Sequence, residues 1–451
     1  MKVVLFEIQA RNRKKCVNKD LAGGMGTGTW IGNSWRARIF EYVKKKSVVL
    51  PEITSAYLAA IFKKAGWEVE RVEVGRGLEI KTVTADLALV PSSIVDCFHE
   101  REAARILKNR GLKVGIYGTF ASAFPDFFIN DADFVIKGEA EAAAIKIVNQ
   151  KELPGGIFEA GRVENLDSLP FPDWSLFPLN KYSYSPVLNK KPVTVMLASR
   201  GCPHTCSYYC AYPLLAGSRL RLRSVDNVVE EIKHLKKKYG VKAIDFRDAL
   251  FICGKQRTRE LAERLIADNL KIIWSCETRL DQIDKELLNI MHRAGLRNIN
   301  VGIESSDPEI LKKSRRLPVL NSYQDEIVAH CHKLGITVAA FFLIGLEDDT
   351  KESILETIKY AKKLNTLVAQ FAIVTPYPGT GFFEKLEKEK LIIDHNWEDY
   401  DEYTPVFKHK NLKTKELLKL KERAFVSYYF RPAYLARHMP KYIFEKFLWP
   451  F

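Results

Sequence analysis

The stretch that decides the fold is Ser199-Arg-Gly-Cys-Pro-His-Thr-Cys-Ser-Tyr-Tyr-Cys-Ala-Tyr-Pro213. It places Cys202, Cys206 and Cys210 close together, directly after the apolar, β-rich stretch 193–198. Three thiolates on one loop can bind three irons of a [4Fe–4S] cluster and leave the fourth iron open for a substrate or cofactor. Soft sulfur ligands favour an iron–sulfur cluster or zinc over hard cations. The stretch therefore predicts a metal–sulfur site where a strand ends.

Two simpler explanations of these cysteines stay open at this point. A disulfide framework is disfavoured, because the chain has only 8 cysteines and its first residues form a strand-like run without the apolar core of a signal peptide. A structural zinc site normally needs a fourth nearby ligand, and His204 is cramped between two of the cysteines. The cluster is the interpretation that we favour.

Composition and charge limit the classes of function. A chain of 451 residues is too long for one ordinary core, so we expect two or three domains. No apolar stretch approaches the ~20 residues of a membrane span, and the thiols indicate a reducing cytoplasm. The net charge of +15 fits a nucleic acid or an anionic membrane surface, but a lysine-rich surface with interspersed acids is the explanation that we favour. This charge also suits cofactors that carry phosphate or carboxylate groups.

Residues 1–150 alternate strands and helices, which predicts a doubly wound, Rossmann-like parallel sheet. We expect strands at 3–8, 69–74, 87–90, 114–117 and 134–136, and helices at 50–65, 98–110 and 139–149. Such sheets bind ligands in the loops at the carboxyl ends of their strands. The small and polar residues of these loops, which suit a large ligand with phosphate, are Gly23, Gly24, Thr27, Ser92, Ser93, Gly118, Thr119, Gly138 and Glu139. The glycine-rich loop matches neither GxGxxG between a strand and a helix nor a P-loop, so a nicotinamide or nucleotide site is disfavoured.

The rest of the chain divides into a linker, a second βα series and an extension. Residues 151–192 are rich in proline, which predicts a linker that packs down through its aromatic residues. Residues 193–385 contain six strand–helix units, which would curl into a partial (β/α)6 TIM-like barrel with its catalytic groups at the strand ends. Residues 386–451 predict a mainly helical, aromatic extension that caps the barrel or touches lipid.

Taken together, the chain resembles the cobalamin-binding radical S-adenosylmethionine (SAM) enzymes over nearly its whole length. The linker Leu166-Asp-Ser-Leu-Pro-Phe-Pro-Asp-Trp174 is similar to the joint between the two domains of that family. The motifs of the barrel half that resemble the family are Arg200-Gly-Cys-Pro203, Tyr212-Pro213, Arg221-Leu-Arg-Ser224, Ile244-Asp-Phe-Arg-Asp248, Gly302-Ile-Glu-Ser305, Phe342-Leu-Ile-Gly345 and Thr375-Pro-Tyr-Pro-Gly-Thr380.

The sequence departs from the family pattern in the cysteine loop and at two later points. The family spacing is CxxxCxxC, whereas this chain has CxxxCxxxC with Tyr208-Tyr209 in place of one aromatic residue. The added residue puts the geometry of the cluster in question more than its existence. The chain also has Asp248-Ala249 where an Asp-Asp pair is frequent, and Gly345-Leu-Glu-Asp-Asp-Thr350 in place of GLPGET.

The resemblance implies three cofactors: a [4Fe–4S] cluster on Cys202, Cys206 and Cys210, SAM on the open iron, and cobalamin on the N-terminal loops. Cleavage of SAM would give a 5′-deoxyadenosyl radical that abstracts hydrogen from an unactivated carbon, and methylcobalamin would methylate that carbon. The residues expected to contact SAM are Tyr208, Tyr209, Arg247, Asp248, Glu277, Arg279, Glu304 and Ile344. For the charged ones among them, salt bridges at the barrel end are the alternative explanation.

The histidines bear on how cobalt would be bound. None of the 9 histidines lies in the pattern Asp-x-His-x-x-Gly, which is used by cobalamin proteins that place a protein histidine on cobalt; His99 follows Asp96 at the wrong spacing. We therefore expect cobalamin without a protein histidine on cobalt. The remaining cysteines have no paired spacing, which argues against a second cluster and against the related methylthiotransferases.

The leading functional hypothesis is a C-methyltransferase that acts on an unactivated carbon. The alternative keeps both cofactors but forms a ring, a carbon–carbon bond or an oxidised product on a lipid or tetrapyrrole. A nucleic-acid-binding or RNA-modifying protein is the third hypothesis and rests on charge alone, so we expect no specific nucleic acid partner. The expected partners are a small-molecule, lipid or peptide substrate and an electron donor such as ferredoxin or flavodoxin. We expect a cytoplasmic protein, with peripheral contact to the inner membrane face through the aromatic tail 442–451.

Overall fold

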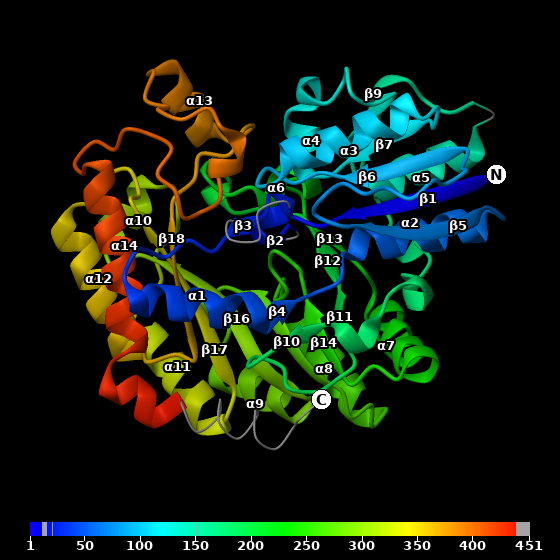
Figure 1. The fold of residues 1–451 in the computed structure, drawn as a ribbon. Coiled ribbons are helices and arrows are strands. Elements are labelled where there is room, and N and C mark those ends of the chain that lie inside the picture. Colours follow the sequence, from blue (N-terminus) through cyan, green and yellow to red (C-terminus); the bar gives the residue numbers. More distant parts are fainter. Residues whose placement is uncertain (11–15, 20, 151, 439–451) are drawn as a thin grey trace.

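The computed structural model describes residues 1–10, 16–19, 21–150 and 152–438. Two six-stranded parallel sheets dominate the molecule, one in the N-terminal part and one in the barrel part (Figure 1). They meet along the edge where the cysteine loop lies. The predicted class, a Rossmann-like sheet followed by a partial barrel and a mainly helical cap, is confirmed.

The N-terminal sheet has the strand order β5-β1-β6-β7-β8-β9, and every neighbouring pair is parallel. Its strands are β1 (Lys2–Ile8), β5 (Glu68–Val74), β6 (Leu87–Pro91), β7 (Val114–Tyr117), β8 (Phe134–Gly138) and β9 (Gly156–Gly161). Helices α2 (Ile53–Lys64) and α5 (Ala140–Asn149) cover one face, and α3 (Cys97–Asn109) and α4 (Thr119–Ala123) cover the other. The strand order reverses between β1 and β6, and ligands bind doubly wound sheets at such a point.

Two elements of the N-terminal half correct the sequence analysis. Strand β9 pairs with β8 and completes the sheet, so 156–161 belongs to the first domain and not to the predicted linker. Helix α1 (Trp35–Ser47) was not predicted, because both of its faces carry apolar residues and no single stripe stands out. Short elements surround it: β2 (Cys16–Asn18), η1 (Ala22–Gly24), β3 (Thr27–Gly28), β4 (Val48–Val49) and η2 (Pro125–Phe127).

The barrel sheet has the order β11-β14-β15-β16-β17-β18, and the two outer strands do not pair with each other, so the barrel is open. Its strands are β11 (Val193–Met196), β14 (Ala243–Phe246), β15 (Ile273–Thr278), β16 (Leu296–Glu304), β17 (Thr337–Ile344) and β18 (Val368–Ile373). The helices of this half are α7 (Val225–Tyr239), α8 (Lys255–Ala267), α9 (Lys285–Arg293), α10 (Pro308–Lys313), α11 (Asn321–Leu334), α12 (Lys351–Leu364) and α13 (Gly381–Lys388). Ser224 caps α7, and Gly240 ends it in the left-handed conformation.

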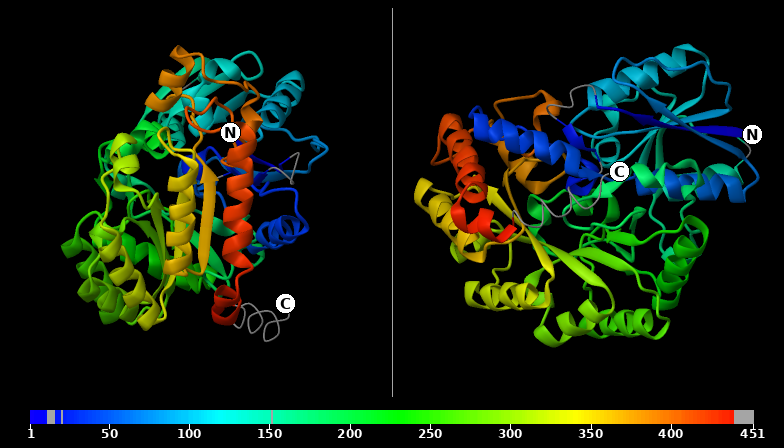
Figure 2. Two further views of the ribbon diagram at one scale, coloured as in Figure 1. Left: turned by 90° about the vertical axis from the view of Figure 1, so that its left-hand side faces the viewer. Right: turned by 60° about the horizontal axis from the view of Figure 1, so that its bottom comes forward.

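The linker and the C-terminal segment pack against this frame. The linker contains η3 (Leu166–Ser168), η4 (Trp174–Leu176), η5 (Leu179–Lys181) and β10 (Ser183–Tyr184), which pairs with β4. Trp174 is fully buried, as expected for a linker that packs down. Helix α14 (Thr414–Tyr429) follows η8 (Trp397–Asp399) and lies along β18 beside α12 (Figure 2). The predicted tail contact at 442–451 lies outside the described residues, and none of the described helices is long and apolar enough to cross a bilayer.

Candidate active site

The cysteine loop grows out of a small hairpin at the end of β11. Strand β12 (Ser199–Arg200) pairs with β13 (Arg221–Leu222) and closes the loop at its base. Gly201 has φ +92°, and a Cβ atom there would lie 2.1 Å from the carbonyl oxygen of Arg219, so only glycine fits. The amide of Cys202 donates to the carbonyl of Gly217 at 3.1 Å and ties the loop to the end of α6 (Tyr212–Ala216).

The loop brings the three cysteine side chains together. The segment η6 (Thr205–Tyr208) and the hydrogen bond from the Cys210 amide to the Cys206 carbonyl (3.0 Å) make one helical turn. This turn places Cys206 and Cys210 on the same side, because residues four apart are neighbours on a helix. Burial raises the pKa of all three thiols, and Cys202 and Cys206 raise the pKa of Cys210 further. The three sulfurs are therefore close enough to interact electrostatically.

The two tyrosines of the enlarged cysteine spacing point in different directions. Tyr209 is buried and lies next to the guanidinium of Arg316. Tyr208 turns outward onto α13, where its ring lies 5.8 Å from that of Phe382, and Arg315 covers it at 4.4 Å. The loop therefore accommodates the additional residue of the CxxxCxxxC spacing by packing Tyr209 inward and Tyr208 outward.

Two of the predicted strand-end residues, Arg247 and Glu277, form a chain with Tyr212 that reaches the loop. The guanidinium of Arg247 donates to Glu277 at 2.5 Å, and the hydroxyl of Tyr212 donates to the same carboxylate at 3.0 Å. Arg247 and Tyr212 also line the large cleft that is described below. Charges that follow β14 and β15 are therefore connected to the helix that ends the cysteine loop.

Other residues that were predicted to contact SAM form hydrogen bonds within the protein instead. Asp248 is fully buried and accepts hydrogen bonds from the Ala198 amide and the Ser199 hydroxyl, so it braces the backbone that leads into the loop. Arg279 donates to Asp281 and to the carbonyl of Leu317. Ile344 is buried at the end of β17. In the structure Asp248 positions the backbone before the cysteine loop, and Arg279 joins the end of β15 to the segment that follows α10. Contact of either residue with SAM stays a prediction.

Glu304 ends β16 in the left-handed conformation, with φ +65°. Burial raises the pKa of its carboxyl, while Arg316, 3.4 Å away, favours the charged form. Strained backbone at a buried charge is typical of functional sites. Arg316 itself was missed by the sequence analysis, because it follows the short helix α10 and belongs to no motif. Its positive charge lowers the pKa of the Cys206 thiol, the Tyr209 hydroxyl and the Glu304 carboxyl against the effect of burial.

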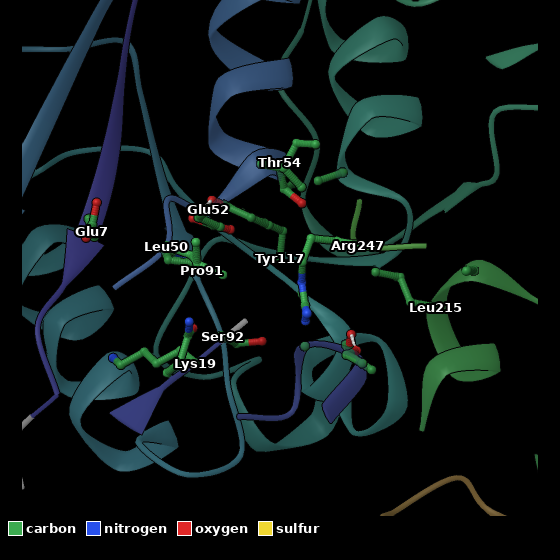
Figure 3. A pocket seen from close by; sticks show the side chains of 18 of the residues that line it. Glu7, Lys19, Leu50, Glu52, Thr54, Pro91, Ser92, Tyr117, Leu215 and Arg247 are labelled. Atoms are coloured by element: carbon green, nitrogen blue, oxygen red, sulfur yellow. Dashed lines mark hydrogen bonds between the residues drawn. The ribbon is translucent and has the colours of Figure 1, made fainter. Parts of the chain in front are cut away.

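A cleft of about 460 Å³ opens between the N-terminal sheet and the cysteine loop (Figure 3). Leu215 and Arg247 from the barrel half face Tyr117 and Ser92 from the N-terminal half across it. The predicted N-terminal residues that line it are Gly23, Gly24, Ser92, Gly118, Thr119, Gly138 and Glu139. It therefore gathers the carboxyl-end loops of β6, β7 and β8 at one place.

The loops of this cleft are tightly built. Gly118 has φ +131°, and a Cβ atom there would lie 2.6 Å from the carbonyl oxygen of Ser92. The hydroxyl of Thr119 donates to the carbonyl of Gly23 at 2.6 Å. Two predicted residues are not among those that line the cleft: Ser93 binds Glu100 through its amide and hydroxyl, and Thr27 is buried.

Glu139 lines the cleft but mainly joins the two halves of the molecule. Its carboxylate contacts Arg221 at 2.6 Å, Arg200 at 3.3 Å and the amide of Val163 at 2.8 Å. Burial opposes ionisation, yet Arg200 and Arg221 hold the pKa of Glu139 below its ordinary value. The two arginines flank the cysteine loop, so this buried network fixes the loop relative to the N-terminal sheet.

The comparisons with known proteins agree with this arrangement. Residues 196–361 match the model of the Radical SAM superfamily. The chain is 30% identical over 420 residues to the uncharacterized methyltransferase PH0819 of Pyrococcus horikoshii, covering 86% of this chain and 89% of the relative.

The chain is a radical SAM enzyme.

A second relative and a solved structure extend this result. The radical SAM enzyme is 29% identical over 332 residues to the anaerobic magnesium-protoporphyrin IX monomethyl ester cyclase of Rubrivivax gelatinosus, which covers 67% of the chain and 58% of the relative. Its fold is similar to that of the cobalamin-dependent SAM radical enzyme OxsB with aqua-cobalamin and SAM bound (TM-score 0.66, 14% identity, 95% of this chain and 67% of the other). The resemblance inferred from the motifs is confirmed in family and fold.

The cysteine loop of this radical SAM enzyme fits an iron–sulfur cluster. Cys202, Cys206 and Cys210 are free thiols in a half-buried loop, and in the described part of the chain no three His, Cys, Asp or Glu side chains, these cysteines included, converge closely enough to hold a single metal ion. A cubane cluster does not need such convergence, because each thiolate binds a different iron. The raised pKa values mean that cluster binding must displace protons from these thiols.

Proposed function

We propose that this radical SAM enzyme binds cobalamin and transfers a methyl group to an unactivated carbon. The observation that supports this most directly is the shared cleft. One wall consists of the small strand-end loops of a doubly wound sheet, and the other consists of the cysteine loop and Arg247. A cofactor seated on the first wall therefore faces a cluster and its ligand on the second.

On the N-terminal side, Gly23, Gly24 and Gly118 leave room for a large cofactor to approach the backbone. Ser92 and Thr119 offer hydroxyls at the same edge, and Gly118 lines the cleft immediately before α4. The cleft-lining residues of the described chain include no histidine, and His99 is buried at the start of α3. This arrangement supports cobalamin bound without a protein histidine on cobalt.

On the barrel side, the three cysteines would hold the cluster, and the groups beside them would orient SAM. When bound, the cluster and SAM provide the means of removing hydrogen from an unactivated carbon, and cobalamin provides the methyl group. Arg316, which pairs with Glu304 at 3.4 Å, would meet the carboxylate of SAM, and Glu304 would accept from its amino group or ribose. The chain Arg247–Glu277–Tyr212 would lie between the two cofactors and hold them apart.

The expected partners follow from this chemistry. The cluster needs a one-electron donor such as ferredoxin or flavodoxin. Pro203 and Thr205 of the cysteine loop are exposed beside Arg315, which gives an acidic donor a short path to the sulfurs. The substrate is a small molecule, with a lipid or a peptide as alternatives. The free thiols of the described cysteines support a cytoplasmic location.

The test is anaerobic reconstitution with iron, sulfide, cobalamin and SAM, followed by reduction. We expect S-adenosylhomocysteine to form and the bound cobalamin to become methylated, and both should be lost with the iron in the Cys210→Ala variant. Both readouts work without a known substrate. Formation of 5′-deoxyadenosine alone, with the cobalamin unmethylated, would refute methyl transfer.

The similarity to the Rubrivivax gelatinosus cyclase favours a second candidate, ring formation on a tetrapyrrole with the same cofactors. Turnover of a magnesium-protoporphyrin ester to a product with an additional ring, without S-adenosylhomocysteine, would support it over methyl transfer.

A further inference from the structure

Helix α1 has one packed face and one exposed apolar face. On the packed side, Ala37 is 1% exposed, and the ring of Phe40 lies 4.2 Å from that of Tyr429 on α14. On the outer side, Trp35, Ile39 and Tyr42 are 64%, 50% and 60% exposed. Their spacing of four and three residues puts them in one stripe along the helix. Such a contiguous apolar stripe on the surface marks an interaction site.

The charges around this stripe are basic. Arg36 and Arg38 are exposed beside it, and neither has an acidic partner within the described part of the chain. The helix has a single acidic residue, Glu41, which is turned inward and accepts from the amide of Ile31 at 2.7 Å. At the start of the helix, Glu422 of α14 accepts from the amides of Asn33 and Ser34, and the guanidinium of Arg36 lies over the rings of Trp35 and Phe430. The exposed stripe itself is apolar and flanked by arginines.

This combination decides between the available occupants. A second copy joined through a two-fold axis would bring the same cationic face against itself, which like-charge repulsion disfavours. An aromatic and aliphatic stripe flanked by arginines is the composition of a helix that lies in the interface of an anionic bilayer. Trp and Tyr are also the side chains that favour the boundary between headgroups and acyl chains. We propose that α1 is a docking helix for an anionic membrane surface.

The position of α1 gives this docking a consequence for the cleft. The helix runs into β4, and Lys45, Val48 and Val49 line the cleft that the two halves of the molecule share. Val49 is also 38% exposed, so an apolar side chain is accessible where the segment after the helix lines the cleft. Docking through α1 would bring that mouth to the bilayer, which suits an amphiphilic substrate; this last step rests on the proposed function.

The test is sedimentation of the full chain with vesicles of phosphatidylcholine containing about 30% phosphatidylglycerol, and with vesicles of phosphatidylcholine alone. We expect binding to the anionic vesicles that weakens as salt is raised. The triple variant Trp35→Ser, Ile39→Ser, Tyr42→Ser should lose at least about fivefold in bound fraction, since each exposed apolar side chain contributes to insertion. The matched control is Leu320→Ser, which removes a side chain that is 76% exposed at a different place and should bind as the parent does.

Three results would overturn the proposal. The triple variant could bind vesicles as tightly as the parent, or a chain that ends at His438 could lose binding that the triple variant keeps. The parent could instead fail to bind vesicles and form a dimer that the triple variant abolishes, as measured by light scattering. Near-ultraviolet circular dichroism of each variant checks that the fold is retained. Vesicle binding is measured without turnover, so its failure is distinguishable from failure of the proposed methyl transfer.

Discussion

Gly201 gives a sharp test of how the cysteine loop is built. Its φ of +92° costs a residue with a Cβ atom roughly 1–2 kcal/mol. The new Cβ atom would also lie 2.1 Å from the carbonyl oxygen of Arg219, and such overpacking adds about 1–3 kcal/mol. We therefore expect Gly201→Ala to destabilise the closed hairpin by roughly 2–5 kcal/mol, which is at least about a thirtyfold shift in its equilibrium. The expected outcome is a chain that still folds but holds much less cluster.

The assay is iron and sulfide per chain after anaerobic reconstitution, together with the visible absorbance of the cluster. The matched control is Gly240→Ala at the end of α7, where φ is +65° but no atom lies within 4 Å of the new Cβ position. It carries the same kind of backbone strain without the clash and should keep its iron. If both variants retain the same iron content, the close approach at Gly201 does not govern the loop, and the reasoning fails.

Three further predictions concern the cleft, the joint between the two halves and the barrel interior. Gly118→Ala should reduce cobalamin uptake at least tenfold in equilibrium dialysis, because its Cβ atom would clash with the carbonyl oxygen of Ser92, directly after β6. The control Gly111→Ala has open space around its new Cβ atom and should keep the parent's uptake. Equal uptake by the two variants would contradict this prediction. Arg221→Met should lower the free energy of unfolding by about 3–5 kcal/mol in urea titrations, because the buried carboxylate of Glu139 loses one of its two arginine partners. The double variant Arg221→Met, Glu139→Gln should recover part of this loss. Burial raises the pKa of Asp245 to about 7, so the protonated carboxyl stabilises the fold below pH 4, and this stabilisation is lost as the pH rises to about 7. The Asp245→Asn variant should therefore show a smaller change in the free energy of unfolding between pH 4 and pH 7. An unchanged slope of that free energy against pH would refute the raised pKa.

Much of the architecture could be predicted from the sequence, because strands and helices are set by local patterns of side chains. Strand 114–117 has the predicted bounds and the helix expected at 139–149 begins one residue later, because both are apolar stretches between clear boundaries. Helix α1 could not be predicted in this way, because its exposed apolar side chains obscure the stripe that packs on α14. Strand β9 was missed because it is mostly exposed at the edge of the sheet and follows a proline.

The sequence by itself determined the family and the order of the two domains, and it predicts the cluster cysteines, since these depend on residues that are close together in the chain. Only the tertiary structure decided which charges meet. Arg316 reaches Glu304, and Glu139 lies between two arginines that follow it by about sixty and eighty residues. Such pairs form only after long stretches of backbone have packed, so no local pattern encodes them. For the same physical reason, the roles of Asp248 as a brace and of α1 as an exposed surface became visible only in the folded chain.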